Sequence, residues 1–230
     1  MKTIGLIGGM SWESSSEYYR IINQAVARRL GGSHSCPSIM VSVDFAEIEE
    51  LQHRGDWAEL TRQMIDAARK LERAGADLVL ICTNTMHKMA DEVQGAIAVP
   101  LLHIADAIAD RIRAAGLERV GLLGTRFTME EAFYKERLAW RQPLRVDVPA
   151  APAREVVHRV IYDELVRGLI RPDSKAAYQR IIAELVAGGA QGIVLGCTEI
   201  PLLVKAEDAP VPLFDSTTIH AEAAVELALE

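Results

Sequence analysis

Apolar residues fall along this chain in two alternating patterns. Short runs rich in valine, isoleucine and leucine are typical of buried strands, and longer segments with an apolar residue at every third or fourth position are typical of helices. The first pattern predicts strands at 3–8, 39–43, 77–82, 98–102, 119–124, 144–148, 192–196 and 211–214. The second predicts helices at 14–30, 57–74, 104–115, 129–139, 154–169, 173–187 and 216–229. This alternation indicates an α/β fold with mainly parallel sheets.

Two of these helices carry a sequence signal for their first turn. Ser14-x-x-Glu17 and Thr128-x-x-Glu131 are capping-box patterns, in which a hydroxyl and a carboxylate satisfy backbone N–H groups at the start of a helix. We therefore expect helices to begin at Ser14 and at Thr128.

The second half of the chain repeats the first half in the same order. The matching segments are 4–9 with 120–125, 75–85 with 189–199, and 99–102 with 211–214, at offsets of 116, 114 and 112 residues. Any two buried strands resemble each other, which explains each match alone but not three matches in one order. The repeat predicts two pseudo-symmetric, three-layer α/β domains, the first formed by 1–103 with 216–230 and the second by 104–215.

The repeat also predicts where a ligand binds. In open α/β sheets, ligands lie beyond the carboxyl ends of the strands, and each matched strand here ends in a small polar or glycine-rich turn. If the two domains face each other, these turns line a single cleft that forms the active site. Thr83 and Cys197 are equivalent in the repeat, so they are expected on opposite walls of that cleft.

Composition excludes several classes of function. Half of the 230 residues are apolar and a quarter are charged, which is typical of a globular protein. A net charge of -7, from 25 Lys and Arg against 32 Asp and Glu, argues against nucleic acid or an anionic membrane as a partner. No apolar stretch reaches the roughly 18 residues of a membrane span, and the first ten residues do not resemble a signal peptide. Three widely spaced cysteines argue against a disulfide framework, so we expect a cytoplasmic protein.

Familiar cofactor and metal motifs do not fit this sequence. Gly5-x-x-Gly8-Gly9 matches neither the dinucleotide-binding nor the Walker A spacing, and no Gly-x-Ser-x-Gly turn is present. His103 aligns with Asp215 in the repeat, which supports no shared metal-ligand pattern. His87 could orient a group in the cleft or serve as a structural histidine at a helix start.

A thiol and a hydroxyl on opposite faces of a small molecule suit proton transfer at a stereocentre. One group removes a proton from carbon and the other delivers a proton from behind. A thiolate is an effective base when its pKa is lowered, and we expect backbone N–H groups at a helix start after Cys197 to lower it. Backbone amides in the small polar turns are expected to bind a carboxylate, as an α-amino acid presents.

Three segments resemble the cofactor-independent aspartate/glutamate racemase family. They are 5–11 (GLIGGMS), 82–87 (CTNTMH) and 195–199 (LGCTE), and the similarity covers essentially the whole chain. The resemblance implies a two-domain α/β enzyme, usually a homodimer, that racemises an acidic amino acid without pyridoxal phosphate or metal. Its two catalytic cysteines lie one in each half.

The resemblance assigns roles to individual residues. Cys197 matches the second catalytic cysteine, which in the family faces the L-enantiomer. Around the substrate, the family's residues match Asn84, Thr85, Thr198 and Glu199. Further candidates to line the site follow matched strand ends or lie in the loop after the second strand: Met10, Gln52, Thr125 and Thr128.

This chain departs from the family in two places. Thr83 stands where the first catalytic cysteine is expected, and Cys82 is one residue early, so Cys82 is expected to point into the core. Related aspartate racemases carry an arginine in the loop after the second strand, where this chain reads 50–54 (ELQHR). If Gln52 takes that place, recognition of a side-chain carboxylate is weakened unless Arg54 reaches in. A neutral polar amino acid is therefore also a plausible substrate.

A hydroxyl is a much weaker acid than a thiol, so inversion through Thr83 is expected to be slow. We therefore expect a kinetically asymmetric racemase, in which Cys197 deprotonates the L form more often than Thr83 completes inversion. Two alternatives stay open. Related folds with only the second cysteine decarboxylate small malonates, and two α/β lobes also describe many non-catalytic small-molecule binding proteins.

Overall fold

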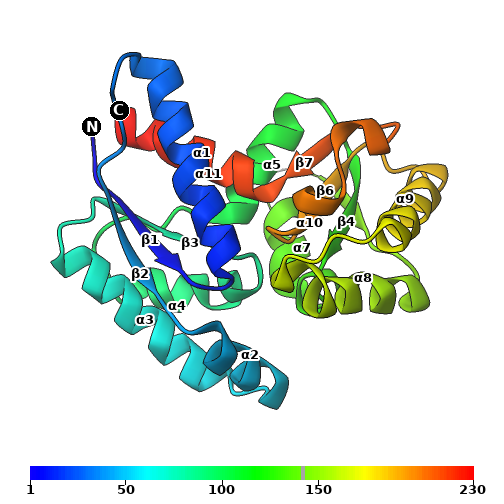
Figure 1. Ribbon diagram of the computed structural model, residues 1–230, viewed down its shortest axis with the longest axis horizontal. Coiled ribbons are helices and arrows are strands. Elements are labelled where there is room, and N and C mark those ends of the chain that lie inside the picture. The colour runs from blue at the N-terminus through cyan, green and yellow to red at the C-terminus, as the bar shows by residue number, and fades with distance from the viewer. Residues whose placement is uncertain (141–142) are drawn as a thin grey trace. The chain divides into compact units, whose positions relative to one another are not determined.

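The computed structural model describes residues 1–140 and 143–230, with helices and strands alternating along the chain (Figure 1). The chain divides into two compact units, residues 1–104 with 220–230 and residues 105–219. One division follows Ile104 and the other falls within the last helix, α11 (Ser216–Leu229). The predicted boundaries at 103 and 216 lie one and four residues from these divisions.

A parallel sheet of order β2-β1-β3 forms the centre of the first unit. Its strands are β1 (Ile4–Gly8), β2 (Ser38–Ser42) and β3 (Leu78–Ile81). The fourth predicted strand, 98–102, is reduced to one isolated bridge between Leu101 and Val79. Pro100 has no N–H with which to extend a ladder, and α5 (Ile104–Ala114) begins soon after it.

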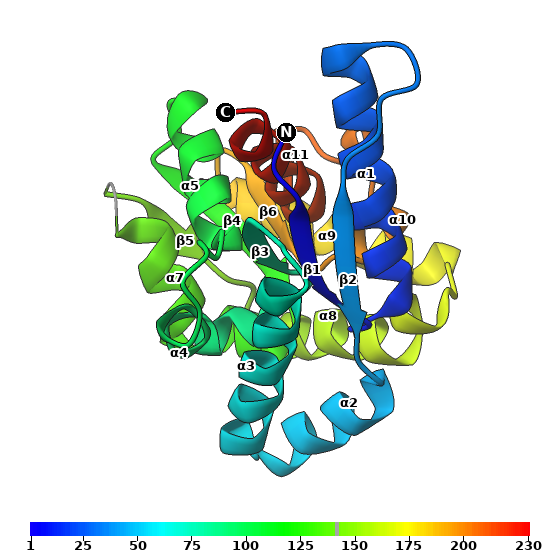
Figure 2. The ribbon, with the colours of Figure 1, turned by 90° about the vertical axis from the view of Figure 1, so that its left-hand side faces the viewer.

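Helices cover both faces of this sheet. One face packs on α1 (Trp12–Leu30) and α11, and the other packs on α2 (Phe45–Arg54) and α3 (Trp57–Arg73). Figure 2 places α1 and α3 on opposite sides of β1. Alternate residues of β1 divide between the two cores, Leu6 facing α1 and Ile7 facing α3. The continuous apolar run of β1 reflects burial on both sides.

The second unit has a parallel sheet of order β5-β4-β6-β7. Its strands are β4 (Arg119–Gly124), β5 (Arg145–Asp147), β6 (Ile193–Gly196) and β7 (Leu213–Asp215). One core is built on α8 (Ala151–Asp163), α9 (Pro172–Ala187) and α10 (Ile200–Leu203). The other helices are α5, α6 (Arg126–Glu130) and α7 (Ala132–Ala139). Alternate residues of β4 are buried on both faces.

The two sheets repeat each other residue by residue. Ile7 pairs with Ile81 in the first sheet, and the equivalent residues Leu123 and Leu195 pair in the second. The isolated bridge in the first unit corresponds in the same way to the first pair of β6 and β7. The predicted fold class, two pseudo-symmetric α/β domains with parallel sheets, is therefore confirmed.

Several element boundaries differ from the predictions. The loop expected after the second strand is largely helix α2, which Asp44 caps at its start and Gly55 (φ 71) ends in the left-handed conformation. The helix expected over 154–169 ends at Asp163 and is followed by a short 3-10 turn, η2 (Leu165–Arg167). Short helical segments also follow β3, at η1 (Thr85–Met89) and α4 (Ala90–Gly95), and precede β7, at η3 (Ala206–Asp208).

Both capping-box predictions place the helix start too late. Ser11, not Ser14, caps α1, and its hydroxyl accepts a hydrogen bond from the Ser14 N–H. Thr125, not Thr128, caps α6 in the same way. In each case the turn directly after the strand supplies the cap, because the helix begins as soon as the strand ends.

Candidate active site

The turn after β1 is built on close backbone packing. Gly9 has φ 92, and a Cβ at this position would lie 2.2 Å from the Val43 carbonyl oxygen, so only glycine fits. The Gly9 N–H donates to the hydroxyl of Ser15 on α1. Met10, a predicted lining residue, is buried in the apolar core beside α2 and α3.

The turn after β3 carries Cys82 and Thr83 on opposite sides of the chain. Cys82 is fully buried among the residues of α1 and α11, and this burial raises the pKa of its thiol. The prediction that Cys82 points into the core is confirmed. Thr83 is partly exposed, as the alternation of side chains along a strand requires. Asn84 and Thr85 follow it and are buried at the start of η1.

Two side chains hold this turn through its carbonyl groups. Ser14 on α1 donates its hydroxyl to the Cys82 carbonyl at 3.0 Å, and His87 Nδ1 lies 2.8 Å from the Thr83 carbonyl. The second ring nitrogen of His87 accepts the Ile104 N–H at 3.2 Å. Nδ1 must therefore carry the proton, and both nitrogens are engaged in the neutral form. Of the two roles open for His87, the structure supports the structural one.

A second histidine lies against His87. The ring centroids of His87 and His220 are 5.6 Å apart, and His220 Nε2 lies 2.9 Å from the Leu102 carbonyl. Tyr18 bonds the other nitrogen of His220 at 2.8 Å. Burial, with a smaller contribution from His87, lowers the pKa of His220 to about 3. The Thr83 turn is thus supported by histidines bonded in their neutral form, a feature that the repeat could not indicate.

Gln52 lies on the buried side of α2, where its amide donates to the sulfur of Met86 at 3.3 Å. Met86 directly follows Thr85, so α2 and the turn after β3 meet at this contact. Arg54 pairs with Glu50 at 3.4 Å along the helix, and its side chain is 62% exposed. The cation is therefore held at the surface, and the neutral amide occupies the buried position.

The turn after β4 is built from two threonines. The Thr125 hydroxyl caps α6 by accepting the Thr128 N–H, and the two hydroxyls lie 3.2 Å apart. Thr128 is fully buried, and a Cβ added at Gly124 would lie only 3.1 Å from it. The predicted lining residues Thr125 and Thr128 therefore form one bonded pair at the end of β4.

Cys197 follows β6 and lies in a group of bonded polar residues. Its thiol donates to Glu199 Oε2 at 3.0 Å, and the Thr198 hydroxyl donates to the same oxygen at 2.8 Å. Cys197 is 7% exposed and Glu199 is 3% exposed. The structure thus brings three predicted site residues into direct contact.

Burial, followed by the neighbouring Glu199 carboxylate, raises the pKa of the Cys197 thiol well above its usual value. Backbone N–H groups of Thr198 and Glu199 bond the sulfur and oppose this shift, but they do not outweigh it. The expected lowering of the thiol pKa is therefore wrong for the protein without substrate. The expected helix start is only the four-residue α10, and the two N–H groups belong to the turn before it.

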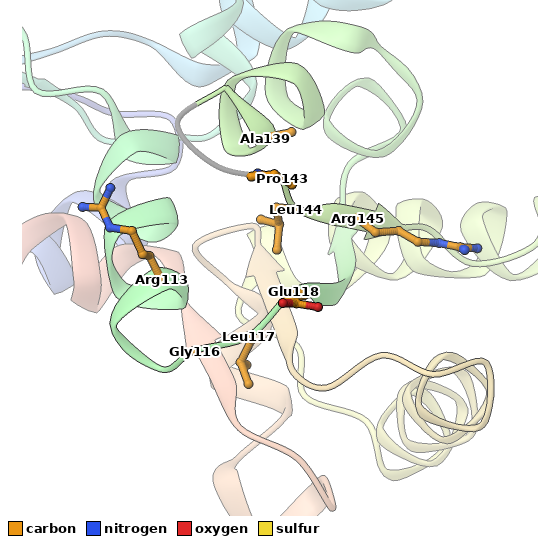
Figure 3. A pocket seen from close by; sticks show the side chains of 8 residues that line it. All are labelled: Arg113, Gly116, Leu117, Glu118, Ala139, Pro143, Leu144 and Arg145. Carbon is orange, nitrogen blue, oxygen red and sulfur yellow. The ribbon is translucent and has the colours of Figure 1, made fainter.

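A separate hollow of about 760 Å³ lies at the amino ends of strands of the second sheet, whereas Cys197 follows a carboxyl end (Figure 3). Glu118 and Leu144, at the amino ends of β4 and β5, contribute to its wall. Its two guanidinium groups are already paired, Arg113 with Asp110 at 2.7 Å and Arg145 with Asp147 at 2.9 Å. The hollow is therefore not part of the group around Cys197, which follows a carboxyl strand end.

Two kinds of feature are absent from the described residues, 1–140 and 143–230. No cluster of three or more His, Cys, Asp or Glu side chains there is arranged to hold a metal ion. No helix in the same ranges is long and apolar enough to cross a membrane.

Comparison with known proteins gives consistent matches. Residues 7–224 match the family described as Asp/Glu/Hydantoin racemase. A crystal structure of a candidate Asp/Glu racemase from Yersinia pestis is 53% identical, covers 100% of both chains and has a TM-score of 0.93. An aspartate racemase homologue from Pyrococcus horikoshii is 37% identical over 100% of both chains, with a TM-score of 0.85. The broad specificity amino-acid racemase RacX of Bacillus subtilis is 26% identical over 96% of each chain.

Proposed function

Because this chain belongs to the Asp/Glu/Hydantoin racemase family, and is thus an isomerase, we propose that it interconverts L- and D-amino acids by two-base proton transfer without a cofactor. Cys197 removes the α-proton of the L form, and Thr83 delivers a proton to the opposite face of the same carbon. The observation that carries this proposal is the shared register of the two sheets. Thr83 and Cys197 occupy equivalent positions beyond β3 and β6, the strands that pair with β1 and β4.

The proton transfers balance as follows. The thiolate of Cys197 takes the α-proton, and the bonding electrons remain on the α-carbon as a carbanion. The Thr83 hydroxyl gives its proton to that carbanion, and the alkoxide then regains a proton from water. Backbone N–H groups in the turns after the strands bind the substrate carboxylate and stabilise the carbanion.

Thr83 makes the two proton transfers of one turnover unequal in rate. A hydroxyl is a weaker acid than a thiol, and each pKa unit corresponds to about 1.4 kcal/mol, so inversion is slower than in a pair of cysteines. The enantiomers have equal free energies in achiral solution, so kcat/KM must match in both directions. The asymmetry therefore consists of frequent return of the proton to the L face.

The substrates are aspartate, glutamate or a broader set that includes neutral polar amino acids. Gln52 supports the wider set, because an amide can bond either a carboxylate or a carboxamide, and Arg54 is held at the surface by Glu50. The Pyrococcus horikoshii relative is described as an aspartate racemase homologue, which supports an acidic substrate. The Bacillus subtilis relative is described as a broad specificity amino-acid racemase, which supports the wider set.

We also propose a cytoplasmic homodimer. The family resemblance supports the dimer, and three free thiols are consistent with a reducing compartment. Light scattering of the purified chain measures its mass directly, and a monomer at all concentrations contradicts this part of the proposal.

The function is tested with a panel of acidic and neutral L- and D-amino acids. Chiral chromatography follows the enantiomers, and NMR in deuterated water follows the α-proton. Racemisation that is lost in Cys197→Ser but retained in Cys36→Ser, a change at another buried thiol, is the expected result. Binding without exchange, or release of CO2 from a substituted malonate without racemisation, would instead select one of the two alternatives.

A further inference from the structure

The reactive thiol of the second unit lies against a buried carboxylate. Cys197 and Thr198 both donate to the same oxygen, Glu199 Oε2, at 3.0 and 2.8 Å. Oε2 is the acceptor in both bonds, as an oxygen of a carboxylate can be. The resting arrangement therefore places a thiol that donates its proton against an acceptor oxygen of Glu199.

The sulfur is also prepared for a negative charge. Backbone N–H groups of Thr198 and Glu199 hydrogen-bond to it, and these contacts favour the thiolate. The turn thus supplies an acceptor for the thiol proton and two donors for the sulfur that remains. These are the parts that proton transfer from sulfur to oxygen requires.

We propose that Glu199 accepts the thiol proton of Cys197 and so generates the thiolate that removes the α-proton of the substrate, an inference that rests on the proposed function. The S–H bond breaks with its electron pair left on sulfur, and an O–H bond forms at Oε2. The pair carries one negative charge before and after this step. Thr198 keeps Oε2 directed at the sulfur.

Direct loss of the thiol proton to water would place two negative charges side by side in a buried site. That arrangement is unfavourable, because burial disfavours each charge and the two repel. Two buried phenols from other elements, Tyr134 on α7 and Tyr178 on α9, also interact electrostatically with Cys197. Burial raises the pKa of both phenols, so both remain protonated and add no negative charge beside the sulfur.

The cycle closes without a further reagent. After Thr83 has delivered its proton, the site holds a thiol, a protonated Glu199 and a Thr83 alkoxide. Water protonates the alkoxide, and the hydroxide formed takes the proton of Glu199. The resting thiol and carboxylate are restored, and no net proton is consumed.

The variant Glu199→Gln separates this role from a purely electrostatic one. Glutamine removes the negative charge that opposes thiolate formation. The pKa of the Cys197 thiol should therefore fall by about one unit, a tenfold change in its acid dissociation constant. Glutamine cannot accept the proton, so α-proton exchange from the L-amino acid should fall by about 100-fold. An electrostatic role alone predicts faster exchange in the variant.

The experiment measures both quantities on the intact protein. Thiolate absorbance near 240 nm is titrated in wild type and Glu199→Gln, each against the same protein with Cys197→Ser, and exchange is followed by NMR. Glu199→Asp, which keeps an acceptor, should retain part of the exchange that Glu199→Gln loses. Exchange at or above the wild-type rate in Glu199→Gln would overturn the proposal.

A wild-type measurement covers the case in which Glu199→Gln does not fold. α-Methylglutamate has no α-proton, so it can bind without reacting. Infrared difference spectra recorded on its binding should show a protonated carboxyl band. This band should be absent in the double variant that carries both Thr198→Val and Cys197→Ser. Binding without that band would contradict proton transfer to Glu199. If the wild type exchanges no amino acid at all, the proposed function fails, while the thiol titration still reports whether Glu199 controls Cys197.

Discussion

The turns after β3 and β6 occupy the same place in two copies of one sheet, yet they are supported differently. The Thr83 turn is held by bonds to its backbone carbonyls from Ser14 and His87. The Cys197 turn places a carboxyl group directly against its sulfur. One copy therefore fixes the backbone that carries a hydroxyl, and the other alters the proton affinity of a thiol. The comparison teaches that a repeated scaffold conserves where a side chain lies, while its neighbours decide what that side chain can do.

The sharpest way to break this comparison is to make the two turns alike. Thr83→Cys places a thiol at both equivalent positions, so inversion should accelerate by about 100-fold, because a thiol is a far stronger acid than a hydroxyl. Chiral chromatography measures the appearance of the D-enantiomer. Cys82→Ala is the control. Because Cys82 lies in the core, this substitution should leave the rate of inversion unchanged. A Thr83→Cys protein that forms the D-enantiomer no faster would contradict the assigned role.

The buried His220 gives the first unit a sensitivity to acid. The pKa of His220 is about 3 in the folded protein and about 6.5 when unfolded, so the unfolded chain binds the proton first. This contribution to stability is present above pH 6.5 and is lost as the pH falls towards 3. Between pH 6.5 and 5 the loss is about 2 kcal/mol.

Urea unfolding at several pH values tests this prediction. His220→Gln removes the titrating ring, so the part of the pH dependence between 6.5 and 5 that is due to His220 should disappear. The same slope in wild type and variant would show that His220 is not the group responsible.

Two substitutions at His87 can test its two hydrogen bonds separately. His87→Asn can keep the donor to the Thr83 carbonyl, and His87→Gln can keep the acceptor for the Ile104 N–H. Losing the bond to Thr83 should slow inversion by about tenfold, the kinetic equivalent of one hydrogen bond, in His87→Gln but not in His87→Asn. Exchange through Cys197 should be nearly unchanged in both, as in the surface control His34→Ala. Equal losses of exchange and inversion would indicate general damage to the fold.

The sequence predicted the elements whose signal is local. The apolar runs of β1 and β4 are buried on both faces and are therefore continuous in the sequence. Alternation along β3 correctly placed Cys82 in the core. Helix α2 has a weaker signal, because its place after a strand also fits a loop although Asp44 and Gly55 mark its two ends. The strand expected at 98–102 is reduced to one bridge because Pro100 cannot donate to a ladder, a local signal that the apolar pattern alone does not include.

The chemistry of the candidate site was less predictable than its position. Cys197 could be placed from the repeat, but the direction of its pKa shift depends on burial and on the rotamer of Glu199. His220 is almost 120 residues along the chain from Leu102, its hydrogen-bond acceptor, so no spacing rule connects them. Both effects arise from tertiary packing.

The central claim is that Cys197 exchanges the α-proton of the L-amino acid more often than Thr83 completes inversion. The most direct test follows one L-amino acid in deuterated water and compares loss of its α-proton with appearance of the D-enantiomer. The account predicts that loss of the α-proton is at least about tenfold faster, a gap of about 1.4 kcal/mol between the two barriers. Equal rates of exchange and inversion would contradict it.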